Sequence, residues 1–585
     1  MKDDIWIWNS MAKRRRSASD TFEENGIHLL KSSLAIDDFS LRIIDWATPD
    51  GFNSITPGVL SKWIHVLYKP LLNQNIPKVF KVVPGILAGI LQNQLSKAQH
   101  KRLTRKLQSL ALQVAKAQLP IFGIKVWYGE AFSYSKLLTD LIHQYAPQTI
   151  VIAGGYHATL YEEDILKYSN FDLAIAGNGE EGLTEILKQI KQYGKWDKEL
   201  FLANFKKQQS TSPISGLIYR DGELVKSNSR DNNRSIPNII PDYPLENNKT
   251  RVHILLESIG CPWNACNFCV HNKFVPVYHS RKVSDIVNEI KEMISQGIGL
   301  FRFAGSDTPP RYGSTIAEGI LEAKLNVEYT MGCRAVKNCK DEQVYDETVL
   351  NFEKLIQSGL RGIFMGGETG NDTVNHEIMN KGIIAEDILY TIKAVRQAEH
   401  NVKQKITVSL AFIYPTPLAE NVSLTEVFDD NIALITQSQP DSVMVTPPGP
   451  FKNTKWYCES DEYGFDLSED IIPRTMEYEY VLYKPLDMWD EIPFSLKNMD
   501  FKEMLSESQR LRKFIESNLK IPTDLSDEHF LMIRSAGLLT EEGIKTFKRK
   551  SLLSIISSDY TYVNTISNKI SSYSKQLADS NNEVL

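Results

Sequence analysis

Short apolar segments alternate with amphipathic segments along most of the 585 residues. In the first part of the chain, five segments have the composition of buried strands, and stretches of helical periodicity fill most gaps between them: 5–8, 41–46, 122–127, 149–153 and 171–176. This alternation is typical of a parallel sheet with helices on both faces. We therefore expect residues 1–200 to form an α/β domain of the doubly wound, Rossmann-like kind.

Two segments interrupt or end this first domain. Residues 54–119 have helical periodicity and predict an inserted helical cap or a lengthened crossover, with apolar side chains at Leu103, Leu107, Leu110, Leu112 and Val114. Further on, Asp221-Gly222 lies between β-prone residues and predicts a hairpin. The polar stretch 226–235 that follows indicates a linker, so we assign residues 201–240 to the hairpin and linker.

A second series of strands and helices predicts a barrel from residue 241 to residue 455. It contains an amphipathic helix at 283–296 and six strand-like segments: 253–257, 300–304, 327–331, 362–365, 406–413 and 442–446. Six parallel units fit a partial (βα)6 TIM-like barrel, in which chemistry takes place at the C-terminal ends of the strands. Residues 456–585 lose the strand pattern and predict a mainly helical C-terminal domain.

The charge and hydropathy of the chain exclude several classes of protein. The formal net charge of -6 gives no general electrostatic reason to bind nucleic acid or anionic lipid, and the basic clusters at 13–16 and 100–106 are typical of solvated helix faces. The first ten residues do not resemble a secretory signal. The most apolar stretch, 83–91, is shorter than the ~20 residues that span a bilayer. We expect a cytoplasmic protein without a membrane span.

Three of the six cysteines crowd into nine positions on the loop after the first barrel strand: Cys261, Cys266 and Cys269. A [4Fe-4S] cluster usually takes four thiolates, so three close cysteines could leave one iron open to another ligand. A zinc site that includes His271 is the alternative, but structural zinc normally pairs two separate knuckles, and the sequence has no second C-x2-C. The other cysteines stay unassigned: Cys333, Cys339 and Cys458.

The segment from Gly260 to Cys269, with Phe268 before the third cysteine, resembles the signature of radical S-adenosylmethionine (radical SAM) enzymes. The usual spacing of that signature is C-x3-C-x2-C, and this chain has one residue more. Similar Cys-Pro-Trp-Asn loops occur in radical SAM proteins that carry a cobalamin-binding domain. The resemblance implies a [4Fe-4S] cluster on the three cysteines, with S-adenosylmethionine (SAM) at the open iron.

Other segments of the barrel resemble the same family. Gly366-Gly367-Glu368 is similar to its Gly-x-Glu-Ser-Gly segment, and residues 379–382 are similar to its Met-x-Lys-Gly segment. Polar residues also stand where the second and third barrel strands end, although strand-to-helix turns and helix caps use the same residue types. The resemblance implies that SAM is bound by Phe268, Ser306, Asp307, Arg334, Gly366, Gly367 and Glu368.

The first domain resembles the cobalamin (B12)-binding domain of cobalamin-dependent radical SAM proteins at three strand ends. The resemblance implies a cobalamin site formed by Trp127, Gly154, Gly155, Tyr156, His157, Gly177, Gly179 and Glu180. The Asp-x-His-x-x-Gly motif that supplies a cobalt ligand in some cobalamin enzymes is absent, because residues 45–51 contain no histidine. This predicts cobalamin without a histidine ligand, and a degenerate domain that no longer binds the cofactor is the alternative.

The resemblance implies reductive cleavage of SAM to a 5′-deoxyadenosyl radical, followed by cobalamin-dependent C-methylation of a small molecule or peptide. It also implies an external one-electron donor such as flavodoxin or ferredoxin. A rearrangement, cyclisation or oxidation without methyl transfer is the alternative enzyme function, and a non-enzymatic metal-binding protein is the remote one. A methylthiotransferase acting on tRNA is disfavoured, because no second cysteine triad and no basic terminal domain are present. We expect no nucleic-acid partner.

Overall fold

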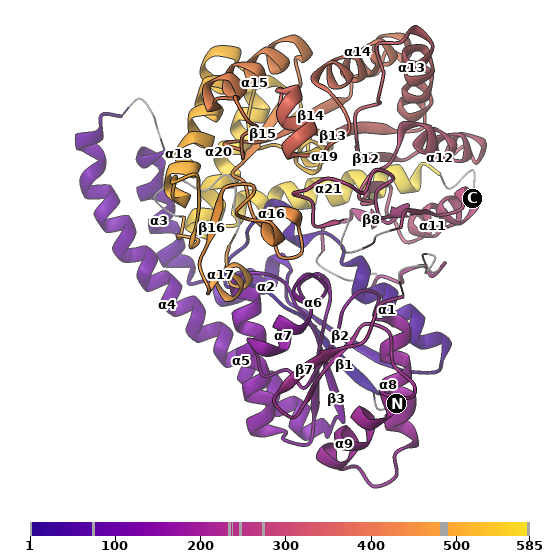
Figure 1. The fold of residues 1–585 in the computed structure, drawn as a ribbon. Helices are drawn as coiled ribbons and strands as arrows, with labels where there is room; N and C mark the ends of the chain where they lie inside the picture. Colours follow the sequence, from indigo (N-terminus) through magenta and orange to yellow (C-terminus); the bar gives the residue numbers. More distant parts are fainter. Residues whose placement is uncertain are drawn as a thin grey trace.

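The computed structural model describes all residues except 1–2, 73–75, 232–235, 237, 245–248, 272–274, 276, 480–488 and 582–585. Part of the predicted linker and the last residues of the chain therefore lie outside the described residues. Two large sheets form the frame of the molecule, one from each half of the chain, and helices surround both (Figure 1).

The first sheet has the strand order β2-β1-β3-β4-β5-β6-β7. Its first five strands are parallel: β1 (Ile5–Asn9), β2 (Leu41–Asp45), β3 (Ile121–Lys125), β4 (Ile150–Gly154) and β5 (Leu173–Ile175). The order 2-1-3-4-5 is that of a doubly wound fold, as predicted. The hairpin of β6 (Leu217–Asp221) and β7 (Leu224–Ser227) was grouped with the linker, but it extends this sheet because β6 pairs antiparallel with β5.

Helices cover both faces of the first sheet because successive strand side chains point to opposite sides. Ile5 and Ile7 pack on one face in a cluster with side chains of α1 (Asn25–Ile36), α8 (Glu180–Gln192) and α9 (Lys198–Gln208). Trp6 and Trp8 pack on the other face with the long helix α4 (Lys78–Ala117) and with α5 (Glu130–Tyr145). Two short helices, α6 (Tyr156–Tyr161) and α7 (Glu163–Lys167), follow β4.

The predicted helical insertion consists of α2 (Pro49–Ile55), α3 (Gly58–Leu71) and α4. The 40 residues of α4 give a helix of about 60 Å. Its C-terminal half packs on the sheet through Leu103, Leu107 and Val114, whereas Leu112 is exposed. Its N-terminal half forms a hairpin with α3 that extends beyond the body of the molecule (Figure 1).

The second sheet has the order β15-β14-β13-β12-β11-β8, and all six strands are parallel. The strands are β8 (His253–Leu255), β11 (Leu300–Phe303), β12 (Glu328–Cys333), β13 (Leu360–Glu368), β14 (Thr407–Ile413) and β15 (Ser442–Thr446). The crossover helices are α11 (Val283–Ser295), α12 (Pro310–Glu322), α13 (Glu342–Gln357), α14 (Ala385–Val402) and α15 (Leu424–Ser438). Because β8 and β15 are not paired with each other, the sheet is the partial barrel that the sequence predicts.

The C-terminal part of the chain completes the barrel core, which the sequence did not predict. It contains an antiparallel pair of strands, β16 (Phe465–Leu467) and β17 (Phe494–Leu496), and the helices α16 (Lys455–Cys458), α17 (Ile471–Met476), α18 (Phe501–Phe514), α19 (Asp527–Ser535), α20 (Glu541–Ser557) and α21 (Thr561–Asp579). The buried Asp527 of α19 accepts hydrogen bonds from Arg302 Nε and Thr330 Oγ1, both at 3.0 Å. Polar side chains inside the barrel therefore find their partners on α19.

No helix within the described ranges is both long and apolar enough to cross a membrane. The domain boundaries given above stay predictions.

Candidate functional site

The three clustered cysteines lie on one loop at the C-terminal edge of the barrel sheet. The loop begins after the short strand β9 (Ser258–Ile259), which pairs antiparallel with β10 (His279–Ser280). Gly260 makes the turn into the loop with φ of +76°, and a Cβ there would lie 2.6 Å from the carbonyl oxygen of Val277. A side chain at this position would therefore displace the start of the loop.

Hydrogen bonds tie this cluster loop to residues 378–382. The backbone N–H of Asn267 donates to the carbonyl of Met379 at 3.0 Å, and its side chain donates to the carbonyl of Ile378 at 3.0 Å. In return, Asn380 Nδ2 donates to the carbonyl of Ala265 at 2.8 Å. Residues separated by more than 110 positions in sequence thus hold the shape of the loop.

Trp263 is the aromatic anchor of the cluster loop. Its Nε1 donates to the carbonyl of Asn380 at 2.7 Å, and the guanidinium of Arg334 lies 5.1 Å from its ring centroid. Gly382 has φ of +72°, and a Cβ at that position would lie 2.2 Å from the indole ring. Only glycine therefore lets the Trp263 ring lie against this backbone.

The cysteines themselves are accessible on this loop. All six cysteines of the chain lie in described positions and form no disulfide, and the three of the loop are partly exposed. Burial raises the pKa of Cys266 to about 12, although the charges of Lys381 and Arg334 lower it. Among the described residues, no three His, Cys, Asp or Glu side chains are gathered as a preformed metal site, so the thiols share a loop without forming a closed ligand set. Three thiolate donors on one accessible loop fit an iron-sulfur cluster.

Asp307 and Arg334 connect the cluster loop to the next two strand ends. Asp307 follows β11, and its carboxylate accepts the backbone N–H of Arg334 at 2.9 Å and lies 4.0 Å from the Sγ of Cys261. Burial raises the pKa of Asp307, and its bond and charge interaction with Arg334 oppose this rise. Arg334 follows β12, and its guanidinium donates to the carbonyl of Lys381. Ser306 is exposed, with its Oγ 3.2 Å from Nδ1 of His271.

Glu368 and Lys381 form an ion pair at the end of β13, with 2.6 Å between Oε1 and Nζ. Burial lowers the pKa of Lys381, but the charges of Glu368 and Cys266 outweigh it, so that the net change is upward. A Cβ on Gly366 would lie 2.3 Å from Oε1 of Glu368, which explains why glycine precedes the pair. Gly367 packs against Leu410 of β14 instead.

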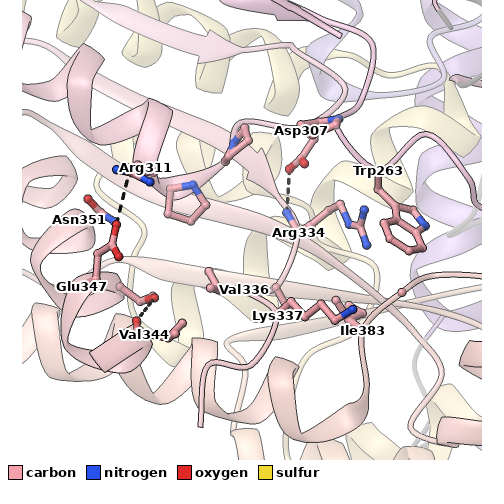
Figure 2. Close-up of a pocket in the computed structure, with 16 residues that line it drawn as sticks. Trp263, Asp307, Arg311, Arg334, Val336, Lys337, Val344, Glu347, Asn351 and Ile383 are labelled. Atoms are coloured by element: carbon pink, nitrogen blue, oxygen red, sulfur yellow. Dashed lines mark hydrogen bonds and ion pairs between the residues drawn. The ribbon is translucent and has the colours of Figure 1, made fainter. Parts of the chain in front are cut away.

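A cavity of about 410 Å³ opens beside these strand ends, between α12 and α13. Figure 2 shows Arg334 between Asp307 and Trp263 in the wall of this cavity. Its volume lies in the lower part of the range of ~300–1,000 Å³ that small-molecule sites occupy. The predicted SAM-binding residues Asp307 and Arg334 therefore border an open space next to the cluster loop.

In the first domain, the ends of β1 and β3 meet at the point where the strand order reverses. The backbone N–H of Trp127 donates to Ser10 Oγ at 3.0 Å, and its indole Nε1 donates to Asn9 Oδ1 at 3.2 Å. The Lys125 ammonium lies 4.7 Å from the ring centroid of Trp127. In doubly wound sheets, ligands bind at this reversal point.

The predicted glycines occupy the neighbouring strand ends. Gly155 precedes α6 and has φ of +91°, and an added Cβ would lie 3.1 Å from Cγ of Lys125. Gly177 has φ of +86° and donates its N–H to Thr159 Oγ1 at 2.9 Å. Added Cβ atoms at Gly154 and Gly179 would meet almost nothing. Glu180 lies in the first turn of α8.

His157 does not reach this open edge, contrary to the prediction. It is 1% exposed, and its ring lies 4.9 Å from Phe132 and 4.7 Å from Tyr161. Burial among these aromatic rings lowers its pKa to about 3. The side chain turns into the core because α6 directs it away from the strand ends.

Tyr156 brings the two halves of the candidate site together. It follows the Gly154-Gly155 turn of the first sheet, and burial raises its pKa to about 12, with the charge of Cys269 adding to this rise. Lys452, beyond β15, donates to the carbonyl of Tyr161 at 2.7 Å and pairs with Asp164. The glycine turn of the first sheet therefore faces the cluster loop of the second.

Several residues that build the site have no recognisable signal in the sequence. Lys381 and Gly382 belong to the segment that resembles Met-x-Lys-Gly, but their contacts with Glu368 and Trp263 depend on the fold. Nothing in the sequence links Asn9 or Ser10 to Trp127. Of the residues predicted to bind SAM, Phe268, Asp307, Arg334 and Glu368 lie around Lys381, whose ammonium is 5.9 Å from the ring centroid of Phe268.

Comparison with protein families finds two matches. The model of the radical SAM superfamily matches residues 258–416, and the model of the B12 binding domain matches residues 86–187. No curated protein matches the chain.

Two kinds of solved structure share the fold. The radical S-adenosylmethionine methyltransferase TsrM from Kitasatospora setae, with cobalamin and a [4Fe-4S] cluster bound, has a TM-score of 0.55 at 12% identity, covering 94% of this chain and 99% of that one. The cobalamin-dependent S-adenosylmethionine radical enzyme OxsB, with aqua-cobalamin bound, has a TM-score of 0.50 at 13% identity and 91% coverage of this chain. The present chain spans 66% of the OxsB chain.

Proposed function

Because the chain combines a B12-binding domain with a radical SAM domain, we propose that it is a cobalamin-dependent radical SAM methyltransferase acting at carbon. The domain pair implies a [4Fe-4S] cluster, SAM and cobalamin as cofactors. The observation that carries the methyl-transfer proposal is that the end of the first sheet lies against the barrel: Lys452, beyond β15, pairs with Asp164, and Tyr156 at the glycine turn lies near Cys269. A cobalamin held at that turn would face a substrate held at the barrel edge.

We assign the residues of the site as follows. Cys261, Cys266 and Cys269 hold the cluster; Phe268, Ser306, Asp307, Arg334, Gly366, Gly367 and Glu368 surround SAM; and Trp127, Gly154, Gly155, Tyr156, Gly177, Gly179 and Glu180 surround cobalamin. When bound, the cluster supplies the electron that cleaves SAM to a 5′-deoxyadenosyl radical, and cobalamin supplies the carrier of the methyl group. The contacts of Trp263 and Asn267 keep the cysteine loop in place.

The charged residues have positioning roles in this proposal. The buried pair of Lys381 and Glu368 places one cation and one anion beside the loop, where a zwitterionic ligand such as SAM can exchange ion pairs with them. Asp307 orients the backbone of Arg334, whose guanidinium lies in the cavity wall. The substrate is a small molecule or peptide, and the electron comes from an external donor such as flavodoxin or ferredoxin.

Metal content after anaerobic reconstitution with iron, sulfide and cobalamin tests the two cofactor sites separately. We expect about four irons and about one cobalt per chain in the wild type. Cys266→Ala should lose the iron and keep the cobalt, whereas Cys458→Ala, which changes an exposed cysteine outside the loop, should keep both. Gly155→Val should lose cobalt alone, because a β-branched side chain is strained at φ of +91° and meets Lys125.

The products of SAM distinguish methyl transfer from the alternative chemistry. Reduced holoenzyme that methylates a substrate forms both 5′-deoxyadenosine and S-adenosylhomocysteine. Formation of 5′-deoxyadenosine alone, with iron but no cobalt in the protein, would replace methyl transfer by rearrangement, cyclisation or oxidation. Zinc in place of iron would overturn the enzyme proposal itself.

A further inference from the structure

The α3–α4 hairpin has a row of apolar side chains that no other part of the described protein covers. On α4, Val79, Val83, Ile86 and Ile90 are 71%, 65%, 61% and 52% exposed. Their spacing of 4, 3 and 4 residues places them on one face of the helix, and we call these four residues the apolar stripe. Phe80, Val82 and Leu87 widen it and are also exposed.

The partner helix α3 repeats the pattern. Val59, Trp63 and Val66 are exposed at spacings of four and three residues, so they too share a face. Lys62 and Lys69 stand beside this face and are exposed. Ten large apolar side chains in one hairpin exceed the scattered exposure that is normal for a monomeric protein, and such patches mark interaction surfaces.

The charged side chains of the hairpin itself have a single sign. Between Gly51 and Gly129 the sequence has eleven Lys and Arg and no Asp or Glu, so the rest of the chain, which brings the total to -6, carries -17. Lys97 lies 18 residues, or five turns, after Val79 and continues the face of the apolar stripe, as does Lys101. Both are exposed. The net charge of the whole chain does not reveal this basic segment, because the acidic remainder cancels its charge.

The surface that matches both properties is an anionic lipid membrane. Amphipathic helices with apolar residues on one face and flanking Lys and Arg insert into the boundary between headgroups and acyl chains. Basic residues near such a surface add attraction to anionic lipids. We propose that the α3–α4 hairpin docks the enzyme peripherally on anionic membranes, with the apolar stripe and Trp63 inserted and Lys97 and Lys101 at the headgroups.

Other occupants fit the same observations less well. A second copy of the hairpin would bring two uniformly basic segments together, which costs free energy through like-charge repulsion. Nucleic acid would use the lysines but would leave the valines and isoleucines of the apolar stripe in water. An anionic membrane can bury the apolar stripe and attract the lysines at the same time.

The hairpin is fixed to the body next to the C-terminal end of the apolar stripe, by residues that point away from it. Gln92 Nε2 donates to the carbonyl of Ile556 at 3.2 Å, and His65 Nδ1 lies 3.6 Å from Asp559. In Figure 1 the N-terminal half of α4 extends beyond these contacts with α20. Insertion of the apolar stripe therefore requires no rearrangement of either sheet.

Co-sedimentation of the full chain with phosphatidylcholine vesicles, with and without phosphatidylglycerol, tests the proposal. We expect binding to the anionic vesicles that weakens as salt is added, because salt screens the exposed lysines. Val83→Asp/Ile86→Asp should lower the partition coefficient roughly a hundredfold, about tenfold for each side chain. Lys97→Gln/Lys101→Gln should lower it about fivefold for each lysine, on anionic vesicles only.

The matched control is Leu200→Asp/Leu350→Asp, which changes two helical residues that are each 56% exposed on α9 and α13. This variant should bind vesicles as the wild type does, and circular dichroism should show that all variants are folded. An equal loss of vesicle binding in this control and in Val83→Asp/Ile86→Asp would overturn the proposal. Equal binding of the wild type to neutral and anionic vesicles would also overturn it. A wild type that binds neither vesicle but forms a dimer, which Val83→Asp/Ile86→Asp dissociates, would assign the surface to a second copy instead.

Discussion

Gly382→Ala is expected to loosen the cluster loop without touching a ligand. The substitution has two effects: an Ala at φ of +72° costs about 1 kcal/mol, and its Cβ would lie 2.2 Å from the Trp263 ring, so the ring must move. Moving the ring breaks the 2.7 Å bond to Asn380, which is worth about 1 kcal/mol. It also removes the contact with Arg334, worth about 0.5–1 kcal/mol. The sum is about 3 kcal/mol of local stability.

Hydrogen exchange of the loop amides, followed by mass spectrometry, measures this local opening. An opening free energy lowered by about 3 kcal/mol corresponds to exchange roughly a hundredfold faster. The amide of Asn267, which donates to Met379, is the one to follow. Gly537→Ala is the matched control, because Gly537 also has φ of +72° but an added Cβ there meets nothing within 4 Å.

A double-variant cycle isolates the clash from the backbone strain. In a Trp263→Ala background, Gly382→Ala should cost only about 1 kcal/mol, since there is no longer a ring to displace. The assignment of Gly382 as the support of Trp263 is wrong if the exchange rate at Asn267 changes less than about threefold in Gly382→Ala. It is also wrong if Gly537→Ala changes that rate as much as Gly382→Ala does.

Three further predictions concern stability and ligand binding. Asp527→Ala leaves the partly exposed cation of Arg302 without its buried partner and should lower the free energy of unfolding by about 2–3 kcal/mol, seen as a lower Tm in calorimetry, whereas Arg302→Met/Asp527→Leu should recover most of it. Burial holds the pKa of His157 at about 3, below its unfolded value, so its contribution to stability is complete above about pH 6.5 and falls as the pH drops. Between pH 7 and pH 4 the free energy of unfolding should therefore fall by about 3 kcal/mol less in His157→Phe than in the wild type. The same pH profile of Tm in both proteins would contradict this. Lys381→Met should weaken SAM binding in calorimetry about tenfold by removing the cation beside Glu368, while Lys340→Met, which disrupts an exposed pair with Glu386, should leave it unchanged.

Strand and helix positions were largely predictable because both sheets are parallel. A buried parallel strand is a nearly continuous apolar run, so segments such as 5–8 and 442–446 could be located from composition alone. The hairpin of β6 and β7 was also visible, but its pairing with β5 was not, since an antiparallel edge strand follows from no local signal. The cysteine loop was predictable in position, whereas its support by Asn380 and Gly382 depends on long-range contacts.

Polar residues were harder to interpret than apolar ones. Arg302 stands in an apolar run and gave no indication that its partner is Asp527, 225 residues later. His157 follows a glycine turn, as a ligand-binding residue would, yet the first turn of α6 points it into an aromatic core. The basic cluster at 100–106, in the C-terminal half of α4, was interpreted as a solvated helix face, and the net charge of the whole chain averages the basic α3–α4 hairpin against an acidic remainder.

The helix that fills the barrel has a consequence for how the chain acquires its structure during synthesis. Residues 253–446 contribute every strand of the second sheet, but Arg302 gains its partner Asp527 only when α19 has been made, and Glu328, which pairs with Arg361 of β13, gains its second partner Arg534 only then. The backbone N–H of Gly299, just before β11, donates to the carbonyl of Ser574 on α21, which is synthesised later still. The nascent barrel therefore leaves the ribosome with charged side chains in an unfilled interior, and it can reach its final packing only after almost the whole chain has emerged.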